Sequence, residues 1–171
     1  MNKFFHTFAL LLIASTIFTS CNNASNRGIV INGVRWATHN VETSGTFARN
    51  PESAGGLFTF EEAQNACPRG WRLPTREELE SLRNVAGGEW TTRNGVNGRT
   101  FGTVPNQLFL PAAGDRSTTG GLSDVGVWGL YWSSTQGIST AWAWLLRLNS
   151  GGTDVFSGNS ADGLSVRCVA E

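Results

Sequence analysis

The side chains that catalyse reactions are sparse in this 171-residue chain. Only one of its two histidines, His39, lies beyond the first twenty residues, and its neighbours Thr38 and Asn40 supply no acid for an acid–base relay. The paired glutamates at 61–62 and 77–78 are better explained as favourable negative charge at the N-termini of helices. The residue types and their spacing therefore predict a protein that is not an enzyme.

Neither a metal site nor a cofactor site is predicted. Zinc sites use about four histidine, cysteine or acidic ligands at close spacing, and the chain has no such set. Asp115, Asp124 and Asp154 are scattered, without the dense run of oxygen ligands that calcium prefers. No glycine-rich phosphate loop follows a strand and opens a helix. We therefore expect no metal and no cofactor.

The three cysteines predict one lipid modification and one cross-link. Cys21 follows Phe18-Thr19-Ser20 and precedes a polar segment, which resembles the lipidation site of a bacterial lipoprotein. Once Cys21 is lipidated, Cys67 and Cys168 remain, and an even pair in an exported domain is typical of a disulfide. The alternatives are ordinary cleavage that leaves Cys21 as a free thiol, and two buried thiols at the other positions.

The N-terminus predicts export. Lys3 supplies a positive start, and the apolar run from Phe8 to Phe18 is too short for a membrane helix, which needs about 20 apolar residues. Such a run fits the hydrophobic region of a signal peptide. We divide the chain into a lipoprotein signal peptide at 1–20, a linker at 21–27 and one domain at 28–171. We expect a lipid anchor in the bacterial cell envelope, at the outer membrane, and leave open whether the domain faces the surface or the periplasm.

Composition predicts a single aromatic-rich domain. About 150 residues follow the signal, which is the size of one domain. Thirteen Lys and Arg residues balance thirteen Asp and Glu residues, so the chain lacks the basic surface of a nucleic-acid-binding protein. Twenty-one glycines and seven tryptophans predict many turns around an aromatic-rich core, with mostly β structure.

Two short helices are expected before a strand-rich second half. Thr59 with Glu62, and Thr75 with Glu78, each form the capping-box pattern that starts a helix. The alternating residues at 141–148 are typical of a strand. This succession predicts an α+β fold with two short helices, antiparallel strands and adjacent termini.

Several large apolar residues are assigned to the core, because burying such a side chain stabilises the fold by roughly 1.5–3 kcal/mol. Arg72 and Arg167 flank core strands, and we expect them to form structural ion pairs with acids such as Glu78 or Glu62. The core assignments are Trp36, Trp71, Trp132, Leu110 and Val166.

A binding surface is expected in the C-terminal half, since aromatic side chains and arginine carry most interface energy. On a regular strand Arg147 lies on the opposite face from Trp142 and Trp144, so one shared site requires the strand to bend or bulge. The alternatives are that both tryptophans belong to the core and that Asp154 and Asn159 are solvated loop residues. The candidate ligand-binding residues are Trp142, Trp144, Arg147, Asp154, Phe156 and Asn159.

Six separated motifs together resemble one family. They occupy residues 33–38, 62–67, 70–75, 108–114, 131–135 and 165–169. The set, which includes Gly-Trp-Arg-Leu-Pro-Thr, Tyr-Trp-Ser-Ser-Thr and Ser-Val-Arg-Cys-Val, resembles the Fibrobacter succinogenes major paralogous domain of gut-bacterial lipoproteins. The resemblance spans residues 28–170 and implies a C-type-lectin-like fold. In that fold a disulfide typically joins the first helix to the last strand, as Cys67 and Cys168 would.

Two related groups share parts of these motifs. Formylglycine-generating oxidases have a similar Arg-Leu-Pro-Thr but need a pair of reactive cysteines near the C-terminus, where this chain has only Cys168. Variable proteins of diversity-generating retroelements display a hypervariable patch that would correspond to residues 127–162.

Taken together, these motifs predict a non-catalytic envelope lipoprotein that binds a glycan or a protein through its C-terminal half. A more specific version of this prediction is a variable protein diversified by a retroelement. The alternative is a structural or assembly component of the envelope without a small-molecule ligand. Besides its ligand, the protein is expected to associate with the membrane through its lipid anchor. No nucleic-acid partner is expected.

Overall fold

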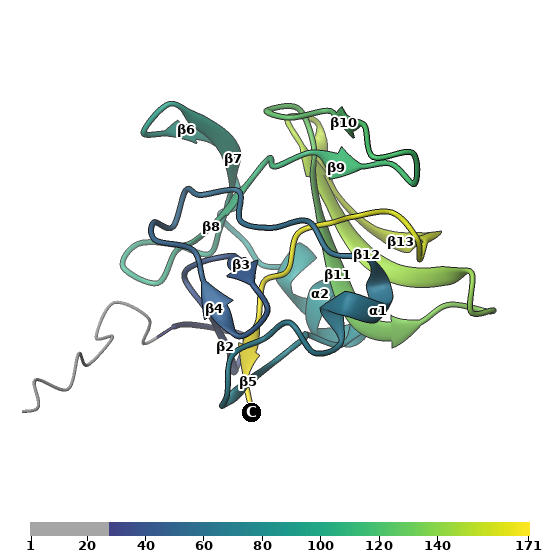
Figure 1. Ribbon diagram of the computed structural model, residues 1–171. Helices are drawn as coiled ribbons and strands as arrows, with labels where there is room; N and C mark the ends of the chain where they lie inside the picture. Colours follow the sequence, from purple (N-terminus) through teal and green to yellow (C-terminus); the bar gives the residue numbers. More distant parts are fainter. Residues whose placement is uncertain (1–27) are drawn as a thin grey trace, which may run out of the picture.

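The structure is a computed structural model that describes residues 28–171. The predicted signal peptide at 1–20, the predicted linker at 21–27 and the predicted lipidation site Cys21 lie outside the described residues. Within the described part, no helix is both long enough and apolar enough to cross a membrane. Several small sheets and two short helices make up the described chain (Figure 1).

The predicted α+β, C-type-lectin-like class is wrong, because the domain is mostly β. Helix α1 (Phe60–Ala63) has four residues and α2 (Arg76–Arg83) has eight. Strands β11 (Gly129–Gln136), β12 (Trp142–Asn149) and β13 (Gly152–Asn159) have eight residues each. Both capping boxes are formed as predicted, and the helices that they start are short, as expected, with only one or two turns each.

Helix α1 ends early because its last turn tightens. The N–H group of Asn65 donates to the Glu62 carbonyl at 3.3 Å, and that of Ala66 donates to the Ala63 carbonyl at 3.1 Å. These are contacts between residues three apart, which do not continue an α-helix. Pro68 then follows and has no N–H group to extend it. A capping signal therefore fixes where a helix begins but not how far it runs.

The two ends of the described chain meet in one four-stranded sheet. Its order is β1-β2-β14-β5, and Val169 of β14 lies opposite Trp36 of β2. An Asn32-Gly33 turn joins the first two strands, and both residues have positive φ values of 49° and 81°, as a type I′ turn requires. The strands of this sheet are β1 (Ile29–Ile31), β2 (Val34–Trp36), β5 (Trp71–Arg72) and β14 (Val169–Ala170).

The remaining small sheets are antiparallel and are built mainly from hairpins. In Figure 1 the hairpin of β6 and β7 and the pair β9–β10 both lie at the top of the molecule. The sheets are β3 (Val41–Thr43) with β4 (Thr46–Phe47), β6 (Trp90–Arg93) with β7 (Val96–Phe101) and β8 (Leu108–Pro111), and β9 (Asp115–Arg116) with β10 (Leu122–Ser123).

The largest sheet, β11-β12-β13, contains a bulge in β11. Trp132 pairs with Leu145 and Gln136 pairs with Ala143, so three residues of β11 lie opposite the single residue Trp144 of β12. Ser133 stabilises the bulge, because its hydroxyl donates to the Trp144 carbonyl at 2.8 Å. The pairing of β12 with β13 is regular throughout, so the extra residues distort only β11.

This bulge, residues 133–135, holds the N-terminus of α2. The N–H group of Ser134 donates to the Pro74 carbonyl at 2.7 Å, and the Thr135 hydroxyl accepts from the N–H group of Arg76 at 3.0 Å. The first N–H groups of a helix lack partners within the helix. The bulge therefore supplies a partner for one of them and fixes α2 against the sheet.

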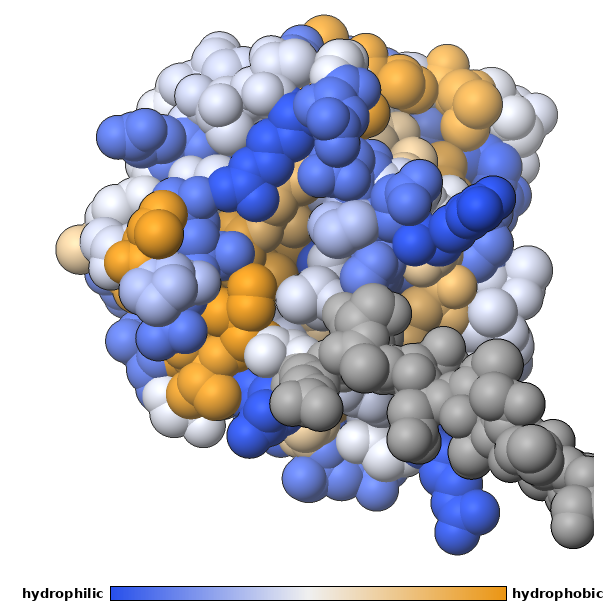
Figure 2. Space-filling model, turned by 90° about the vertical axis from the view of Figure 1, so that its left-hand side faces the viewer, coloured by the Kyte–Doolittle hydropathy of each residue, from blue (hydrophilic) through white to orange (hydrophobic). Residues whose placement is uncertain are grey.

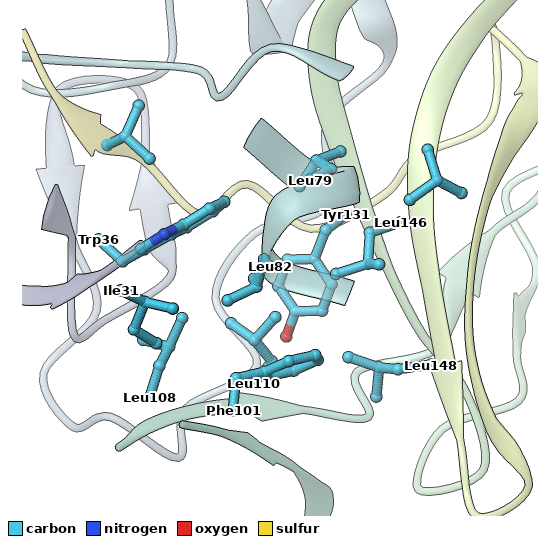
Figure 3. Packing of buried hydrophobic residues seen from close by; sticks show 12 residues of the cluster. Ile31, Trp36, Leu79, Leu82, Phe101, Leu108, Leu110, Tyr131, Leu146 and Leu148 are labelled. Atoms are coloured by element: carbon cyan, nitrogen blue, oxygen red, sulfur yellow. The ribbon is translucent and has the colours of Figure 1, made fainter. Parts of the chain in front are cut away.

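Buried side chains form two clusters. In the first, Leu79 and Leu82 of α2 point toward Tyr131 and Leu146 of the sheet (Figure 3). The second lies beneath α1 and contains Trp132, whose ring N–H donates to the Phe58 carbonyl at 2.7 Å, which satisfies its one polar group. Four of the five core assignments are confirmed as buried, namely Trp36, Trp132, Leu110 and Val166, whereas Trp71 is half-buried.

The surface drawn in Figure 2 is mixed. Outside the area covered by grey atoms, its hydrophobic residues form separate patches with hydrophilic residues between them. This face therefore offers no single continuous apolar surface of the kind that marks a large protein interface.

The predicted disulfide is confirmed. Cys67 and Cys168 are bonded, 101 residues apart in the sequence, and Cys168 is fully buried in the second cluster. The bond ties the turn after α1 to the residue that precedes β14. It therefore closes a loop that contains most of the domain.

Replacing both cysteines by serine is expected to lower the free energy of unfolding by about 4–5 kcal/mol, because the unfolded chain regains the entropy of a loop of that length. Urea denaturation of the variant, beside the oxidised and reduced wild type, measures this loss. Equal unfolding midpoints for the oxidised and reduced wild type would contradict the expectation.

Candidate ligand-binding site

The six predicted binding residues lie on both faces of the β11-β12-β13 sheet and do not form one site. Side chains opposite each other in adjacent strands share a face, and neighbours along a strand alternate. Because β12 and β13 pair without any shift, the bulge in β11 does not change this alternation. One face carries Trp142, Trp144 and Asn159, and the other carries Arg147, Asp154 and Phe156.

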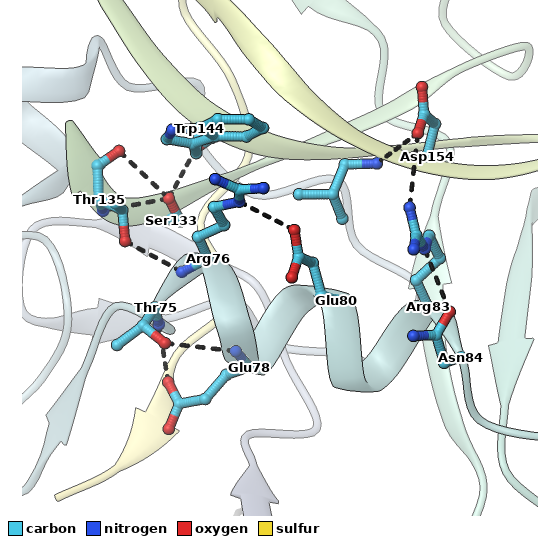
Figure 4. Close-up of polar contacts among 11 residues, drawn as sticks. Thr75, Arg76, Glu78, Glu80, Arg83, Asn84, Ser133, Thr135, Trp144 and Asp154 are labelled. Atoms are coloured by element: carbon cyan, nitrogen blue, oxygen red, sulfur yellow. Dashed lines mark hydrogen bonds and ion pairs between the residues drawn. The ribbon is translucent and has the colours of Figure 1, made fainter. Parts of the chain in front are cut away.

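On the first face, Trp144 has a structural environment. Its ring packs against the first core cluster, and the Arg76 guanidinium lies 3.6 Å from the ring centroid (Figure 4). The Nε group of Arg76 also donates to Glu80 at 2.8 Å, which holds the guanidinium over the ring. Trp142, by contrast, is 44% exposed at the start of β12. Of the two tryptophans, Trp142 is therefore the more accessible to a ligand on this face.

Asparagine side chains close two turns of this sheet. The side-chain oxygen of Asn159 accepts from the N–H group of Ala161 at 3.0 Å, so this exposed residue shapes the chain after β13. The Asn149 side chain accepts from the N–H groups of Gly151 and Gly152, at 2.9 and 3.1 Å, and so stabilises the β12–β13 turn. Both are local turn contacts, which asparagine commonly forms.

On the second face, Arg147 lies between two aromatic rings. Its guanidinium carbon is 4.8 Å from the ring centroid of Trp128 and 4.6 Å from that of Phe156. Sequence reasoning missed Trp128. The signal was the alternation of Trp128, Leu130 and Trp132, which places Trp128 on the same face as Leu130, the residue that pairs with Arg147.

Trp128 and Arg147 line a shallow, open depression of about 340 Å³ at the β12–β13 turn. Such a volume is at the lower end of small-molecule sites. An aromatic ring, a guanidinium, a carboxylate and a hydroxyl together supply both stacking and hydrogen bonding. The other lining residues are Asn149, Gly151, Gly152, Thr153 and Asp154.

Two arginines share the carboxylate of Asp154. One oxygen lies 3.7 Å from Arg83 of α2, and the other lies 3.9 Å from Arg147. The Asp154 side chain is 54% exposed, so solvent screens both ion pairs and each contributes little stability. With two guanidiniums for one carboxylate, this group of three carries a net positive charge. Figure 4 shows Arg83 reaching Asp154 from the helix.

Asp154 also covers an edge of the sheet. β13 is the outer strand, and the N–H group of Val155 donates to the Asp154 carboxylate at 2.9 Å. An exposed strand edge with free backbone groups is prone to pair with other chains. Asp154 therefore has a structural role in addition to its place in the depression.

One of the two predicted ion pairs, that of Arg72, is confirmed, and that of Arg167 is not. Arg72 and Glu78 are confirmed as partners through two hydrogen bonds of 2.8 and 2.7 Å, and this contact, foremost among the causes, lowers the pKa of Glu78. For Arg167 the expectation is wrong. Its guanidinium is buried and donates to the side-chain oxygen of Asn40 and to the Ala37 carbonyl, neither of which is an acid.

Within residues 28–171, no group of three or more His, Cys, Asp and Glu side chains is placed to hold a metal ion. The side chains that line the depression offer stacking, hydrogen bonds and charge.

A family model for the Lcl C-terminal domain matches residues 30–170. The chain belongs to the Lcl C-terminal domain family. This confirms the coarser part of the resemblance, a Fibrobacter-type paralogous domain of the Lcl family, while the exact family member stays a prediction. No curated protein and no solved structure matches the chain. No solved structure therefore supports the lectin-like part of the expected fold.

The motifs that carried the resemblance meet in this Lcl C-terminal domain. Residues 70–75 and 131–135 join at the N-terminus of α2, where Ser134 contacts Pro74. Residues 165–169 run beside the sheet, and the N–H group of Trp132 donates to the Ser165 carbonyl at 3.2 Å. The motif residues therefore specify the scaffold, and the depression lies outside most of them.

Trp144→Ala in this Lcl C-terminal domain is expected to lower the free energy of unfolding by about 2–4 kcal/mol, because the half-buried ring supports the core and Arg76. Trp142→Ala is the matched control and is expected to cost less than about 1 kcal/mol, as for other exposed positions. Urea denaturation of the two variants distinguishes the environments. Equal losses would show that the two rings are equally structural.

Proposed function

We propose that this domain is a non-catalytic binding module that takes a saccharide in the depression of Trp128, Arg147 and Asp154. The main support is the guanidinium of Arg147, which two rings hold at the edge of an open depression. A tryptophan ring can cover the C–H side of a sugar. Arginine donates hydrogen bonds and aspartate accepts them, so the pair suits neighbouring sugar hydroxyls.

The size of the depression favours a saccharide over a protein. A stable protein interface buries about 800 Å² on each partner, centred on apolar anchors. The depression is small, and most of the residues that line it are polar or glycine. A protein ligand and a purely structural role in the envelope are the competing outcomes of the experiment below. The runner-up is the structural role.

The cellular setting is part of the same proposal. The apolar segment at 8–18 and Cys21 support export and lipidation, and thus an envelope lipoprotein of the Fibrobacter succinogenes type. A retroelement-diversified surface at 127–162 is a more specific form of the proposal. It requires a near-copy of the gene's 3′ end downstream, differing at adenines.

Labelled fatty acid is expected to enter the protein, and Cys21→Ser is expected to abolish the labelling, since the thiol is the site of attachment. Metabolic labelling followed by gel analysis measures this. Cys67→Ser is the matched control, because it removes a different thiol. Undiminished labelling of Cys21→Ser would refute the lipid anchor.

Binding to a glycan array tests the proposed site. We expect the disulfide-bonded domain, residues 22–171, to give a specific hit, and Trp128→Ala and Arg147→Gln to weaken it at least about tenfold, as loss of a central anchor does. Arg93→Gln is the matched control, because Arg93 stacks on Phe109 at 5.1 Å outside the depression.

The outcomes separate the alternatives. Full affinity in folded Trp128 and Arg147 variants would show that the ligand binds elsewhere on the domain. No hit for a folded domain, together with binding to an envelope-protein array, would indicate a protein ligand. No binding in either array would favour the structural role.

A further inference from the structure

Arg167 holds the chain segment that carries His39. Its Nε donates to the Asn40 side chain at 2.9 Å, and its Nη1 donates to the Ala37 carbonyl at 3.0 Å. These two acceptors flank His39 in the chain, and the Arg167 charge acts on its ring. His39 is 6% exposed and Arg167 is 1% exposed. The fold therefore places a group that can gain a proton beside a buried positive charge.

Burial and the Arg167 charge both oppose protonation of His39. Burial is the main cause that lowers its pKa from 6.5, the Arg167 charge lowers it further, and the carboxylate of Glu52 has a smaller, opposite effect. Tyr131 of β11 acts on Arg167, and burial raises its own pKa to about 12, so it is neutral. The Thr38 hydroxyl contacts Nδ1 of the ring at 2.8 Å. A protonated ring would therefore lie in a buried and positively charged environment, which is unfavourable.

The chain next to His39 also holds a loop, residues 48–56. The N–H group of Ala48 donates to the Asn40 carbonyl at 2.8 Å. At the other end of the loop, the N–H group of Gly56 donates to the Val41 carbonyl at 2.9 Å. Both bonds depend on where residues 40 and 41 lie. A shift of this segment would therefore weaken both ends of the loop together.

This loop lines an open hollow of about 320 Å³, which is separate from the depression. Glu52 of the loop and Asn94 of the turn between β6 and β7 are among its lining residues. Within the loop, the Ala54 carbonyl accepts from the Asn40 side chain at 2.7 Å, the same side chain that binds Arg167. The position of the segment around His39 therefore influences the shape of the hollow.

We propose that His39 is an acid-sensitive switch that releases the loop at 48–56. At neutral pH the uncharged ring allows residues 37–41 to stay packed against Arg167. When the ring gains a proton, two positive charges lie close together in a buried place, and a buried charge without a compensating partner is strongly unfavourable. The segment then moves away from Arg167, and the loop loses its contacts. This switch does not depend on the proposed function.

Stability as a function of pH tests the switch. Because the folded protein resists the proton that the unfolded chain accepts near pH 6.5, the contribution of His39 to stability is full above that pH and is lost below it. Urea unfolding is measured from about pH 7.5 to about pH 5.5, and we expect the folding equilibrium constant to fall by up to about tenfold per pH unit in the lower part of this range. Constant stability over the whole range would overturn the proposal.

Variants assign the effect to His39. His39→Gln keeps a polar side chain that cannot gain a proton in this range, and we expect it to lose the pH dependence. Glu52→Gln removes the charge that favours the protonated ring, so we expect it to extend the loss of stability to lower pH. Glu42→Gln is the matched control, because it removes an exposed acid that is not among the groups acting on His39. An unchanged pH dependence in His39→Gln would overturn the proposal.

Hydrogen exchange shows which part of the chain is released. The N–H groups of Ala48 and Gly56 report on the loop. The N–H group of Thr100 in β7, which donates to the Glu89 carbonyl at 2.8 Å, is the reference. Over the same pH range we expect the protection factors of the two loop positions to fall several-fold more than that of Thr100, because the loop opens without unfolding of the domain. Equal changes at all three positions would overturn the release of the loop.

Discussion

The contact between the β11 bulge and the first turn of α2 determines how the rest of the domain is arranged. Ser134 and Thr135 bond to Pro74 and Arg76 across the junction of sheet and helix. Once α2 is fixed there, its two buried leucines face the sheet, and its arginines reach Trp144 and Asp154. Residues 70–75 and 131–135, which are far apart in the sequence, thus together fix the helix to the sheet. The same contact places Arg83 near Asp154 at the depression, although neither motif lines it.

Features encoded over a few residues could be predicted from the sequence. Both capping boxes and the Asn32-Gly33 turn depend on neighbouring side chains, and all three are present. The disulfide was also predictable, because only two cysteines remain after Cys21. The fold class was not, because the pairing of many short strands into several small sheets depends on contacts between distant parts of the chain, which local patterns do not contain. Helix α1 stops after four residues, and the chain around it forms small sheets instead.

The candidate site was predictable in part. Alternation along β12 correctly separated Arg147 from Trp142 and Trp144, since the bulge that would unite them lies in β11. Trp128 was missed because it precedes the strand and its contact with Arg147 crosses between strands. The acid partner expected for Arg167 was wrong for a related reason. A sequence pattern shows that a charge flanks a core strand, but burial decides which atoms surround it.

The tight β12–β13 turn forms part of the rim of the depression. Asn149 pairs with Gly152 at the last position of the hairpin, so only two residues lie between the strands. Residues inserted between these two positions would change the rim of the depression. They would not alter the strand register, the bulge in β11 or the disulfide. If the depression binds a ligand as proposed, loops of different length and composition at this point would give copies of the same scaffold different ligand preferences.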